Sequence, residues 1–513
     1  MANSLEDKVL RSPREIWVVN PFDQIPNESD LPLRYWSLCR TFAEQGHNVI
    51  WWSSDFSHIH KIKREPCPET EGFLVRLIET PPYTKNISFA RLKNHKAFAD
   101  GFYHDAMAGL KSGELKAPDR IIVSLPPLGV AEVAFKIRDF VRKVESENLS
   151  GEKSTSDSPC EVIVDIMDAW PEAFYRVLPK PLRNFLGPIL LAPMHRSAKR
   201  AYQGADKISG VGQSYLDLAQ RYLQSVRETS IGVDKTQNGA GTSLLQTPLH
   251  LCYHGTDLSR FERNRGVDRG ASHQGSVWEQ QSTQHSTNKT LRAVYIGAMG
   301  SGYDLQTIID VAERWKAEGI FPFQIHFAGI GPQLEQLKAR CKKLGLLMSE
   351  QDSDRESEHE LNNNLVSSST FLSSAPVVFH GFLKKDAINE LLLSSDIALV
   401  TNRPDSLVAC PYKAGEYAAA SLPIISCLEG ELGELLGYWN AGSEYNEGDV
   451  VSLHAAFRSY STDLNLLKQQ RLNARKMAEA LFDRGKSYQE LSEFILIRSP
   501  QEAHSIVERI APD

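Results

Sequence analysis

Short apolar runs alternate with helical segments twice along this chain, and that alternation limits the fold more than any other feature. Residues 16–20 are typical of a buried strand, residues 33–45 have the spacing of a helix with one apolar face, and residues 48–52 form a second apolar run. A strand, a helix and a strand in this order open a doubly wound parallel sheet. The first half adds apolar runs at residues 74–78, 120–125, 161–166 and 207–211.

The same alternation starts again at residues 291–296, and a charged helical tail follows it. Two successive α/β segments of similar size predict two Rossmann-like doubly wound domains. We expect an N-terminal domain over residues 1–250, a C-terminal domain over 251–480 and a terminal helix over 481–513. Four segments are too polar to form core and are interpreted as surface insertions: residues 145–159, 228–246, 266–290 and 349–374.

The composition indicates a globular protein and excludes several classes of function. A hydrophobic fraction of 41% and a charged fraction of 24% over 513 residues suit two large domains in solution. The formal net charge of −7 gives no support for nucleic-acid binding. The 7 cysteines are scattered, with no Cys-x-x-Cys pair and no zinc spacing, so no metal site is predicted. Because neither a signal peptide nor a membrane-spanning run is found, a cytoplasmic location is predicted.

One segment of the second half, residues 403–426, concentrates charge where a helix begins. Arg403 lies in its loop, a short Ala-rich helix opens at Tyr412, and Lys413 and Glu416 follow within one turn. The N-terminus of a helix carries unpaired N–H groups and favours anions, and Lys413 adds a full positive charge there. Glu416 can accept hydrogen bonds from sugar hydroxyls. The combination suits a phosphorylated sugar ligand.

This segment resembles the nucleotide-sugar binding region of group-1, or family-4, glycosyltransferases of the GT-B fold. The residues that match the family pattern are Pro411, Lys413, Glu416, Tyr417, Ala419, Pro423, Ile424 and Ile425. Further turns match in the expected order, and Asp168-Ala-Trp170-Pro171 resembles the Asp-x-Trp-Pro loop of members that build bacterial surface polysaccharides. The resemblance implies two domains that face a cleft, with C-terminal helices crossing back to the first domain.

The resemblance also implies roles for single residues. Arg403 and Lys413 would stabilise the departing diphosphate, and Asp168 would position or deprotonate the acceptor hydroxyl. Glu416 would bind the ribose, within a donor site that holds Tyr412, Gly297, Gly300, Gly329, Gly381, Phe382, Leu383, Asp405 and Ser406. No cofactor or metal would be required beyond the nucleotide-diphosphate sugar itself, and the anomeric configuration would be retained.

The sequence departs from the family pattern in the donor half. Hexosyl-transferring members carry a second Glu eight positions before the one at Glu416, where this chain has Val408. Asp405 or Ser406 is the candidate replacement. The glycine loop at residues 300–304 carries neither Arg nor Lys, so Arg403 and Lys413 are the expected substitutes.

Each of these residues also has a structural interpretation. Glu416 could form an ion pair with Lys413 within the helix. Arg403 could be a loop arginine in solvent, and the glycines could serve tight turns alone. Asp168 could cap a turn before Pro171.

Acceptor binding is assigned to the first domain, through Asn27, Arg34 and Trp170. Asn27 and Arg34 lie at the first strand–helix turn, which is the usual ligand edge of this architecture. The alternative for Arg34 is a helix-surface arginine. Asp165, at the end of a strand, is more simply structural.

Residues 176–200 mix six basic residues with an apolar run that is too short to span a bilayer. Such a patch can lie on an anionic membrane surface, where lipid-linked acceptors are found. The alternative is a buried loop and helix with solvated flanks.

The predicted function is therefore a glycosyltransferase of glycoconjugate or polysaccharide biosynthesis. Two alternatives remain at this stage: a nucleotide-sugar 2-epimerase of the same fold, and a nucleotide-sugar binding protein without turnover. A nicotinamide dehydrogenase is less consistent, because the loop at residues 21–32 has no glycine.

Overall fold

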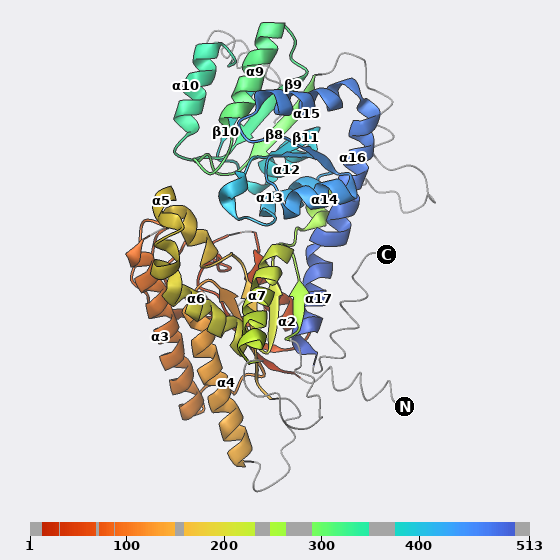
Figure 1. Cartoon of the computed structure of the whole chain (residues 1–513). Coiled ribbons are helices and arrows are strands. Elements are labelled where there is room, and N and C mark those ends of the chain that lie inside the picture. Colours follow the sequence, from red (N-terminus) through yellow and green to blue (C-terminus); the bar gives the residue numbers. More distant parts are fainter. Residues whose placement is uncertain are drawn as a thin grey trace, which may run out of the picture. The chain divides into compact units, whose positions relative to one another are not determined.

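The computed structural model describes residues 13–29, 31–67, 71–86, 88–148, 159–230, 247–262, 290–347 and 375–497. The chain forms two compact units (Figure 1). Unit 1 comprises Met1–Gly255 and Gly485–Asp513, and unit 2 comprises Thr256–Arg484. The units divide after Gly255 and after Arg484, whereas the sequence predicted boundaries at residues 250 and 480.

Unit 1 is built on a seven-stranded sheet with the order β3-β2-β1-β4-β5-β6-β7, in which all paired strands are parallel. Its strands consist of almost continuous apolar residues, because helices cover both faces of the sheet. Between β1 and β4 the chain reverses the direction in which it adds strands, so the switch point of the sheet lies there. The strands are β1 (Glu15–Val19), β2 (Asn48–Ser54), β3 (Phe73–Ile78), β4 (Arg120–Leu125), β5 (Glu161–Ile166), β6 (Lys207–Gly210) and β7 (Leu249–Leu251).

The helices of unit 1 cover the sheet in two groups. Figure 1 shows α3, α4 and α6 side by side, and α2 with α17 forms the second group, whose apolar side chains join one core with the strands. The helices are α2 (Arg34–Glu44), α3 (Phe89–Ser112), α4 (Leu128–Asn148), α5 (Lys180–Arg183), α6 (Gly187–Gly204), α7 (Gln213–Ser230) and α17 (Arg484–Leu496), with a 3₁₀ turn η1 (Glu172–Val177).

Helix α17 comes from the end of the chain but belongs to the core of unit 1. Its side chains Leu491 and Phe494 are buried there. Three buried cations bind the carbonyl groups of its last turn: Arg14 donates to Leu496 at 3.2 Å, Arg120 to Ile495 at 2.9 Å, and Lys207 to Ile495 at 3.1 Å. Cations at this end satisfy free carbonyls and oppose the helix dipole. The predicted return of the C-terminal helix to the first domain is confirmed.

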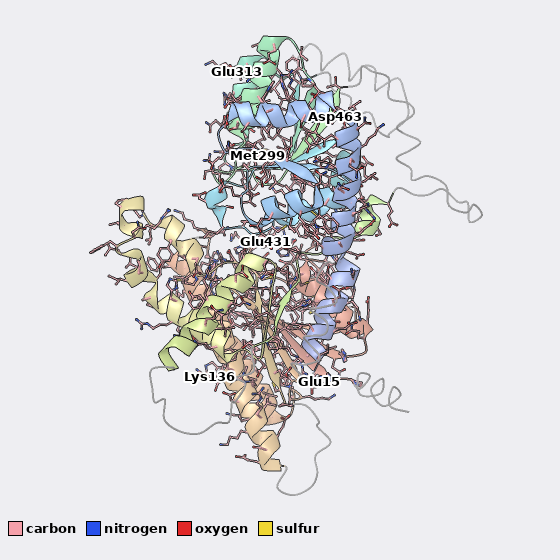
Figure 2. The ribbon with its side chains drawn as sticks, turned by 45° about the vertical axis from the view of Figure 1, so that its right-hand side comes forward. Glu15, Lys136, Met299, Glu313, Glu431 and Asp463 are labelled. Carbon is pink, nitrogen blue, oxygen red and sulfur yellow. The ribbon has the colours of Figure 1, made fainter. Side chains whose placement is uncertain are left out.

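Unit 2 is built on a six-stranded parallel sheet with the order β10-β9-β8-β11-β12-β13. The order again starts in the middle and reverses, between β8 and β11. Met299, labelled in Figure 2, marks the loop that follows β8. The strands are β8 (Leu291–Ile296), β9 (Phe323–Ala328), β10 (Val377–Gly381), β11 (Ile397–Val400), β12 (Ile424–Ser426) and β13 (Gly442–Glu444).

The helices of unit 2 also pack on its sheet. Helices α9, α10 and α15 share one apolar core with the strands, around Trp315 and Phe457. The helices are α9 (Gln306–Glu318), α10 (Leu334–Leu344), α12 (Lys385–Leu393), α13 (Tyr412–Ala419), α14 (Glu431–Trp439), α15 (Val450–Thr462) and α16 (Leu464–Met477), with 3₁₀ turns η2 (Leu258–Phe261) and η4 (Pro404–Ser406) and a π turn η5 (Ala478–Phe482).

The predicted α/β class with two doubly wound parallel sheets is confirmed. Two edge strands, β7 and β13, were not predicted. The predicted insertions at residues 145–159, 228–246, 266–290 and 349–374 lie almost wholly outside the described residues, although α4 and α7 continue into the first residues of two of them. Among the described helices, none has the length and apolar character needed to cross a membrane.

Candidate functional site

The candidate site of unit 2 lies at the carboxyl ends of β8, β9 and β10, where glycine turns touch. Gly297 and Gly329 have φ angles of +145° and +137°, which favour glycine. The N–H of Gly297 donates to Ala328 O at 3.0 Å, and the N–H of Gly329 donates to Gly381 O at 2.7 Å. A Cβ on Gly329 would lie 1.9 Å from the Gly297 carbonyl oxygen. Close packing of these turns therefore requires glycine at position 329.

Lys413 reaches the Gly297 turn from the first turn of α13. Its Nζ is buried, has no hydrogen-bond partner among the described residues, and lies 4.4 Å from the ring centroid of Tyr295 and 4.8 Å from that of Tyr303. A Cβ on Gly297 would lie 2.8 Å from this Nζ, so glycine leaves room for the ammonium group. Burial lowers the pKa of Lys413 to about 7, because no acidic group replaces the lost hydration.

Two buried tyrosines hold α13 and the turn after β8 in place. The hydroxyl of Tyr417 accepts from Ile296 N at 2.7 Å and donates to Ile296 O at 3.3 Å. The hydroxyl of Tyr295 donates to Ala298 O at 2.6 Å. Packed side chains, rather than a loop, therefore hold Lys413 in its position beside the glycine turn.

Glu416 pairs with a cation that the sequence did not single out. Its Oε1 accepts from Arg260 at 2.8 Å, and Arg260 also donates to Asn389 Oδ1 at 2.8 Å. The ion pair between Lys413 and Glu416, considered from the sequence, is therefore wrong. The Glu416 side chain is only 14% exposed, and its other carboxylate oxygen, Oε2, has no hydrogen-bond partner in the described part of the chain. Arg260 lies in the η2 turn that Asp257 caps, and no pattern in the sequence singled it out.

Arg403 lies in the loop after β11 and forms an ion pair with Glu447. Its backbone N–H donates to Gly302 O at 3.1 Å, which places this loop against the loop after β8. Gly300 and Gly302 have open space where a side chain would be. Arg403 is thus not an unpaired solvent arginine, and any phosphate bound there would compete with Glu447.

The remaining predicted donor residues lie on neighbouring loops of unit 2. Asp405 and Ser406 belong to η4, just before α13. The hydroxyl of Tyr412 accepts from Arg484 at 2.9 Å.

The loop after β10 contributes one open aromatic face. Gly381 has a φ of +65° and ends the strand. Phe382 follows it and is 75% exposed, and Leu383 beside it is half-buried. The ring of Phe382 thus has a free face for a flat ligand group.

In unit 1, Asp168 follows β5 and orients the next tryptophan. Its Oδ1 accepts from Ala169 N at 2.9 Å, and its Oδ2 accepts from the indole N–H of Trp170 at 3.2 Å. Trp170 is buried and packs on Phe174 with a centroid distance of 4.5 Å. Asp168 therefore shapes this loop, and a role toward an acceptor stays a prediction.

Arg34 is buried, whereas the sequence suggested either a ligand contact or a helix-surface arginine. Its Nε and Nη2 donate to the two oxygens of Asp165 at 2.8 and 2.9 Å. Asp165 also accepts from Tyr35 and Ser209, each at 2.7 Å. Burial acts to raise the pKa of Asp165, but the Arg34 guanidinium outweighs it and keeps that pKa below its usual value. The surface alternative is wrong, and this geometry favours a structural role for both residues.

Asn27, the third predicted acceptor residue, is exposed. Its side-chain amide lies 3.4 Å from the carbonyl oxygens of Glu65 and Pro66. No group of three His, Cys, Asp or Glu side chains arranged to hold a metal ion is found within the described ranges.

Comparison with solved structures shows that this fold is the GT-B fold of glycosyltransferases. Sucrose-phosphate synthase from Thermosynechococcus elongatus is similar with a TM-score of 0.55 at 13% identity, over 94% of this chain and 98% of that chain. Anabaena HepE in complex with UDP gives 0.54 at 12%, over 94% and 98%. WaaG, a glycosyltransferase involved in lipopolysaccharide biosynthesis, gives 0.51 at 13%, over 94% and 99%. The sequence matches no protein-family model and no curated protein.

Proposed function

We propose that the protein is a glycosyltransferase and that unit 2 binds its nucleotide-diphosphate sugar. The observation that carries the proposal is the buried, unpartnered Nζ of Lys413 beside the Gly297 turn. An isolated buried ammonium group is unfavourable, and a bound anion compensates it. Parallel sheets bind ligands at this carboxyl edge, next to the switch point. The likeness in fold to glycosyltransferases, one of them complexed with UDP, supports the same assignment.

Each donor residue has a distinct task in this proposal. Lys413 neutralises the negative charge that grows on the diphosphate as its bond to the sugar breaks. Oε2 of Glu416, which has no partner among the described residues, accepts from the ribose hydroxyls, and Arg260 fixes the carboxylate by binding Oε1. The exposed ring of Phe382 stacks on the base, flanked by Gly381 and Leu383. Arg403 contributes less than Lys413 because Glu447 neutralises it.

Unit 1 binds the acceptor in this proposal. The oriented carboxylate of Asp168 holds the acceptor hydroxyl and accepts its proton as the hydroxyl oxygen attacks the anomeric carbon. Asn27 and Trp170 line the same carboxyl edge. The reaction proceeds with retention and serves polysaccharide or glycoconjugate synthesis, as the family resemblance implies.

Ligand-induced stabilisation tests the donor site. The diphosphates of uridine, guanosine and adenosine, and their sugar derivatives, are added to the full chain and the melting temperature is measured. We expect at least one to raise it, and the shift to vanish in Lys413→Met. Lys468→Met, which removes an exposed lysine of α16, is the matched control and keeps the shift. If no nucleotide diphosphate shifts the wild type, the proposal fails.

Product analysis separates transfer from the two other activities of this fold. Incubation with the identified donor alone leaves the donor sugar unchanged if the enzyme transfers it to an acceptor. An epimerised sugar would show a 2-epimerase instead. Tight nucleotide binding without transfer or hydrolysis, over a broad acceptor panel, would show a binding protein.

We also propose that helices α5 and α6 contact an anionic membrane, where a lipid-linked acceptor would be reached. One face of α6 is buried, as the alternative expected, but Phe185, Ile189 and Leu190 are 81%, 67% and 59% exposed. Arg196 and Lys199 lie on the same helix. Apolar side chains beside basic ones are typical of helices that lie on membranes. Sedimentation with anionic vesicles tests this: binding should be lost in Phe185→Ser/Ile189→Ser and should fall with salt.

A further inference from the structure

A second group of cations lies in unit 1, at the carboxyl edge of its sheet. His58 and Lys61 come from the loop after β2, and Arg91 and His95 come from the first two turns of α3. Phe22, from the loop after β1, touches this group by ring contacts with His58 at 5.3 Å and His95 at 5.2 Å. The group therefore gathers side chains from several strand ends beside the switch point between β1 and β4, where doubly wound sheets bind ligands.

The four basic side chains contact one another and neutral groups. Lys61 Nζ donates to Asn86 Oδ1 at 2.7 Å and lies 3.4 Å from His58 Nδ1. Arg91 Nε donates to His95 Nε2 at 3.2 Å, and its Nη1 donates to Asn86 O at 2.8 Å. Two positive charges are thus held close together by imidazole rings and one asparagine.

Among the described residues, no carboxylate lies within 4 Å of Lys61 or Arg91. The two cations that follow Lys61 show the contrast: Lys63 pairs with Asp55 at 3.3 Å, and Arg64 pairs with Glu28 at 3.0 Å. Asp168 acts on Arg91 only at longer range. The fold therefore supplies counter-charges to neighbouring cations and leaves this pair without one.

Aromatic rings surround the unpaired cations. Lys61 Nζ lies 4.4 Å from the centroid of Tyr83, and the Arg91 guanidinium lies 5.4 Å from that of Phe22 and 5.3 Å from that of Trp170. Cation–π contacts hold the charges in place without neutralising them. Ring faces next to hydrogen-bonding groups are also the usual lining of small-molecule sites.

The pKa shifts of the four basic side chains are those expected of a site that can bind an anion. Burial, together with Arg91 and Lys61, lowers the pKa of His58 to about 4, and burial together with Arg91 lowers the pKa of His95 to about 3. Burial is also the main cause of the lowered pKa of Arg91 and Lys61. The imidazoles are therefore neutral at pH 7, and the positive field comes from the lysine and the arginine. Keeping two such charges partly buried without an acid is costly, and an anion relieves that cost.

We propose that Lys61 and Arg91 bind the phosphate group of a phosphorylated sugar, with Trp170 and Phe22 beside the sugar ring. Two cations match a phosphate dianion, and the guanidinium can bind two of its oxygens. Describing this sugar phosphate as the acceptor rests on the proposed function. It names a substrate class for unit 1: an acceptor whose sugar carries a phosphate, either free in solution or at the head of a lipid.

Direct binding to the full chain tests the proposal. Glucose 6-phosphate, mannose 6-phosphate and fructose 6-phosphate are titrated by calorimetry, with the unphosphorylated sugars and inorganic phosphate in parallel. A second arm uses vesicles that carry a polyprenyl diphosphate sugar. We expect a phosphorylated ligand in one of the two arms to bind at least tenfold more tightly than its uncharged sugar.

Matched variants then locate the site. Lys61→Met and Arg91→Gln should each weaken that ligand about tenfold or more, because each removes a charge-assisted contact. Lys63→Met removes a cation two residues away that has its own acidic partner, and it should leave binding unchanged. Melting temperatures of all variants show that the fold is intact. Lys61 is the safer test, because Arg91 also donates to His95 Nε2 and to the backbone carbonyl of Asn86.

The outcomes separate this proposal from the donor site. Absence of binding in both arms, or equal binding by wild type and Lys61→Met, overturns the phosphate site. Nucleotide binding is measured on the same samples, and Lys413→Met should weaken it at least tenfold while sugar-phosphate binding persists. If sugar phosphate binds and no nucleotide does, the phosphate site stands and the transferase proposal fails.

Discussion

Arg34 in unit 1 and Lys413 in unit 2 are both buried cations near the carboxyl edge of a parallel sheet, but they differ in their partners. Arg34 is bound by both oxygens of Asp165, whereas Lys413 has two aromatic rings and no acid. A buried ion pair is complete without a ligand. A buried cation without a partner leaves the counter-charge to whatever binds. The presence or absence of an acidic partner, more than burial, thus separates a structural cation from a candidate ligand contact.

The largest expected effect follows from breaking the paired site. Arg34→Met leaves Asp165 buried without its counter-charge, which costs about 3–5 kcal/mol of stability. A large drop in melting temperature should result. Arg34→Met combined with Asp165→Asn should recover most of the loss. An unchanged melting temperature for the single variant would contradict the structural role of Arg34.

The unpaired site should respond in the opposite way. Lys413→Met removes a buried charge that lacks a partner, so the melting temperature should stay the same or rise. The affinity for the nucleotide diphosphate should fall by about 1.5–3 kcal/mol, the range for a hydrogen bond to a charged group. Calorimetry on wild type, Lys413→Met and Lys468→Met measures both quantities. Lower stability of Lys413→Met with unchanged affinity would show that Lys413 is a structural cation and not a ligand contact.

The pH dependence of nucleotide binding gives a second test of the unpaired Lys413. Lys413 has a pKa of about 7 in the free protein, and a bound diphosphate raises it. Affinity should therefore be greatest below pH 7 and should fall by about tenfold per unit above it, until the pKa of the complex is reached. Lys413→Met should lose this fall and retain only the titration of the ligand. A flat profile in the wild type would contradict a buried, titrating lysine at the site.

Glu416 should contribute to binding of the ribose of the nucleotide and not to binding of its phosphates. Glu416→Gln weakens acceptance from ribose hydroxyls and should cost nucleotide affinity about 1 kcal/mol. Binding of inorganic pyrophosphate, which has no ribose, should stay unchanged. Equal losses for both ligands would place Glu416 at the phosphates instead.

The smallest effect is expected at Arg403. Its guanidinium is partly exposed and already paired with Glu447, so Arg403→Gln should change nucleotide affinity by less than about 1 kcal/mol. Glu447→Gln should raise the affinity slightly by freeing the arginine. A loss at Arg403 as large as that at Lys413 would show that the pair opens for the ligand.

Much of the fold could be predicted because both sheets are parallel and buried. The bounds of β4, β5 and β8 agree with the predicted apolar runs, since strands covered on both faces are apolar throughout. Strands β7 and β13 were missed because three residues at a sheet edge carry too short a pattern.

The candidate site was less accessible to sequence reasoning. The start of α13 was predicted from its motif, and Lys413 with it. The sequence could not show that Lys413 Nζ lies against the rings of Tyr295 and Tyr303 rather than beside an acid, because the fold brings these tyrosines from a distant part of the chain. The ion pairs of Glu416 with Arg260 and of Arg34 with Asp165 likewise join residues whose proximity no local pattern encodes.

The C-terminal helix of unit 1 has a consequence for synthesis of the chain. Helix α17 fills part of the unit 1 core, and its last carbonyls bind Arg14, Arg120 and Lys207. All of unit 2 leaves the ribosome before this helix does. We therefore expect unit 2 to fold first, while unit 1 is completed only when α17 has been synthesised. A stop codon just after residue 484 should release a well-formed unit 2 attached to an N-terminal half that chaperones retain.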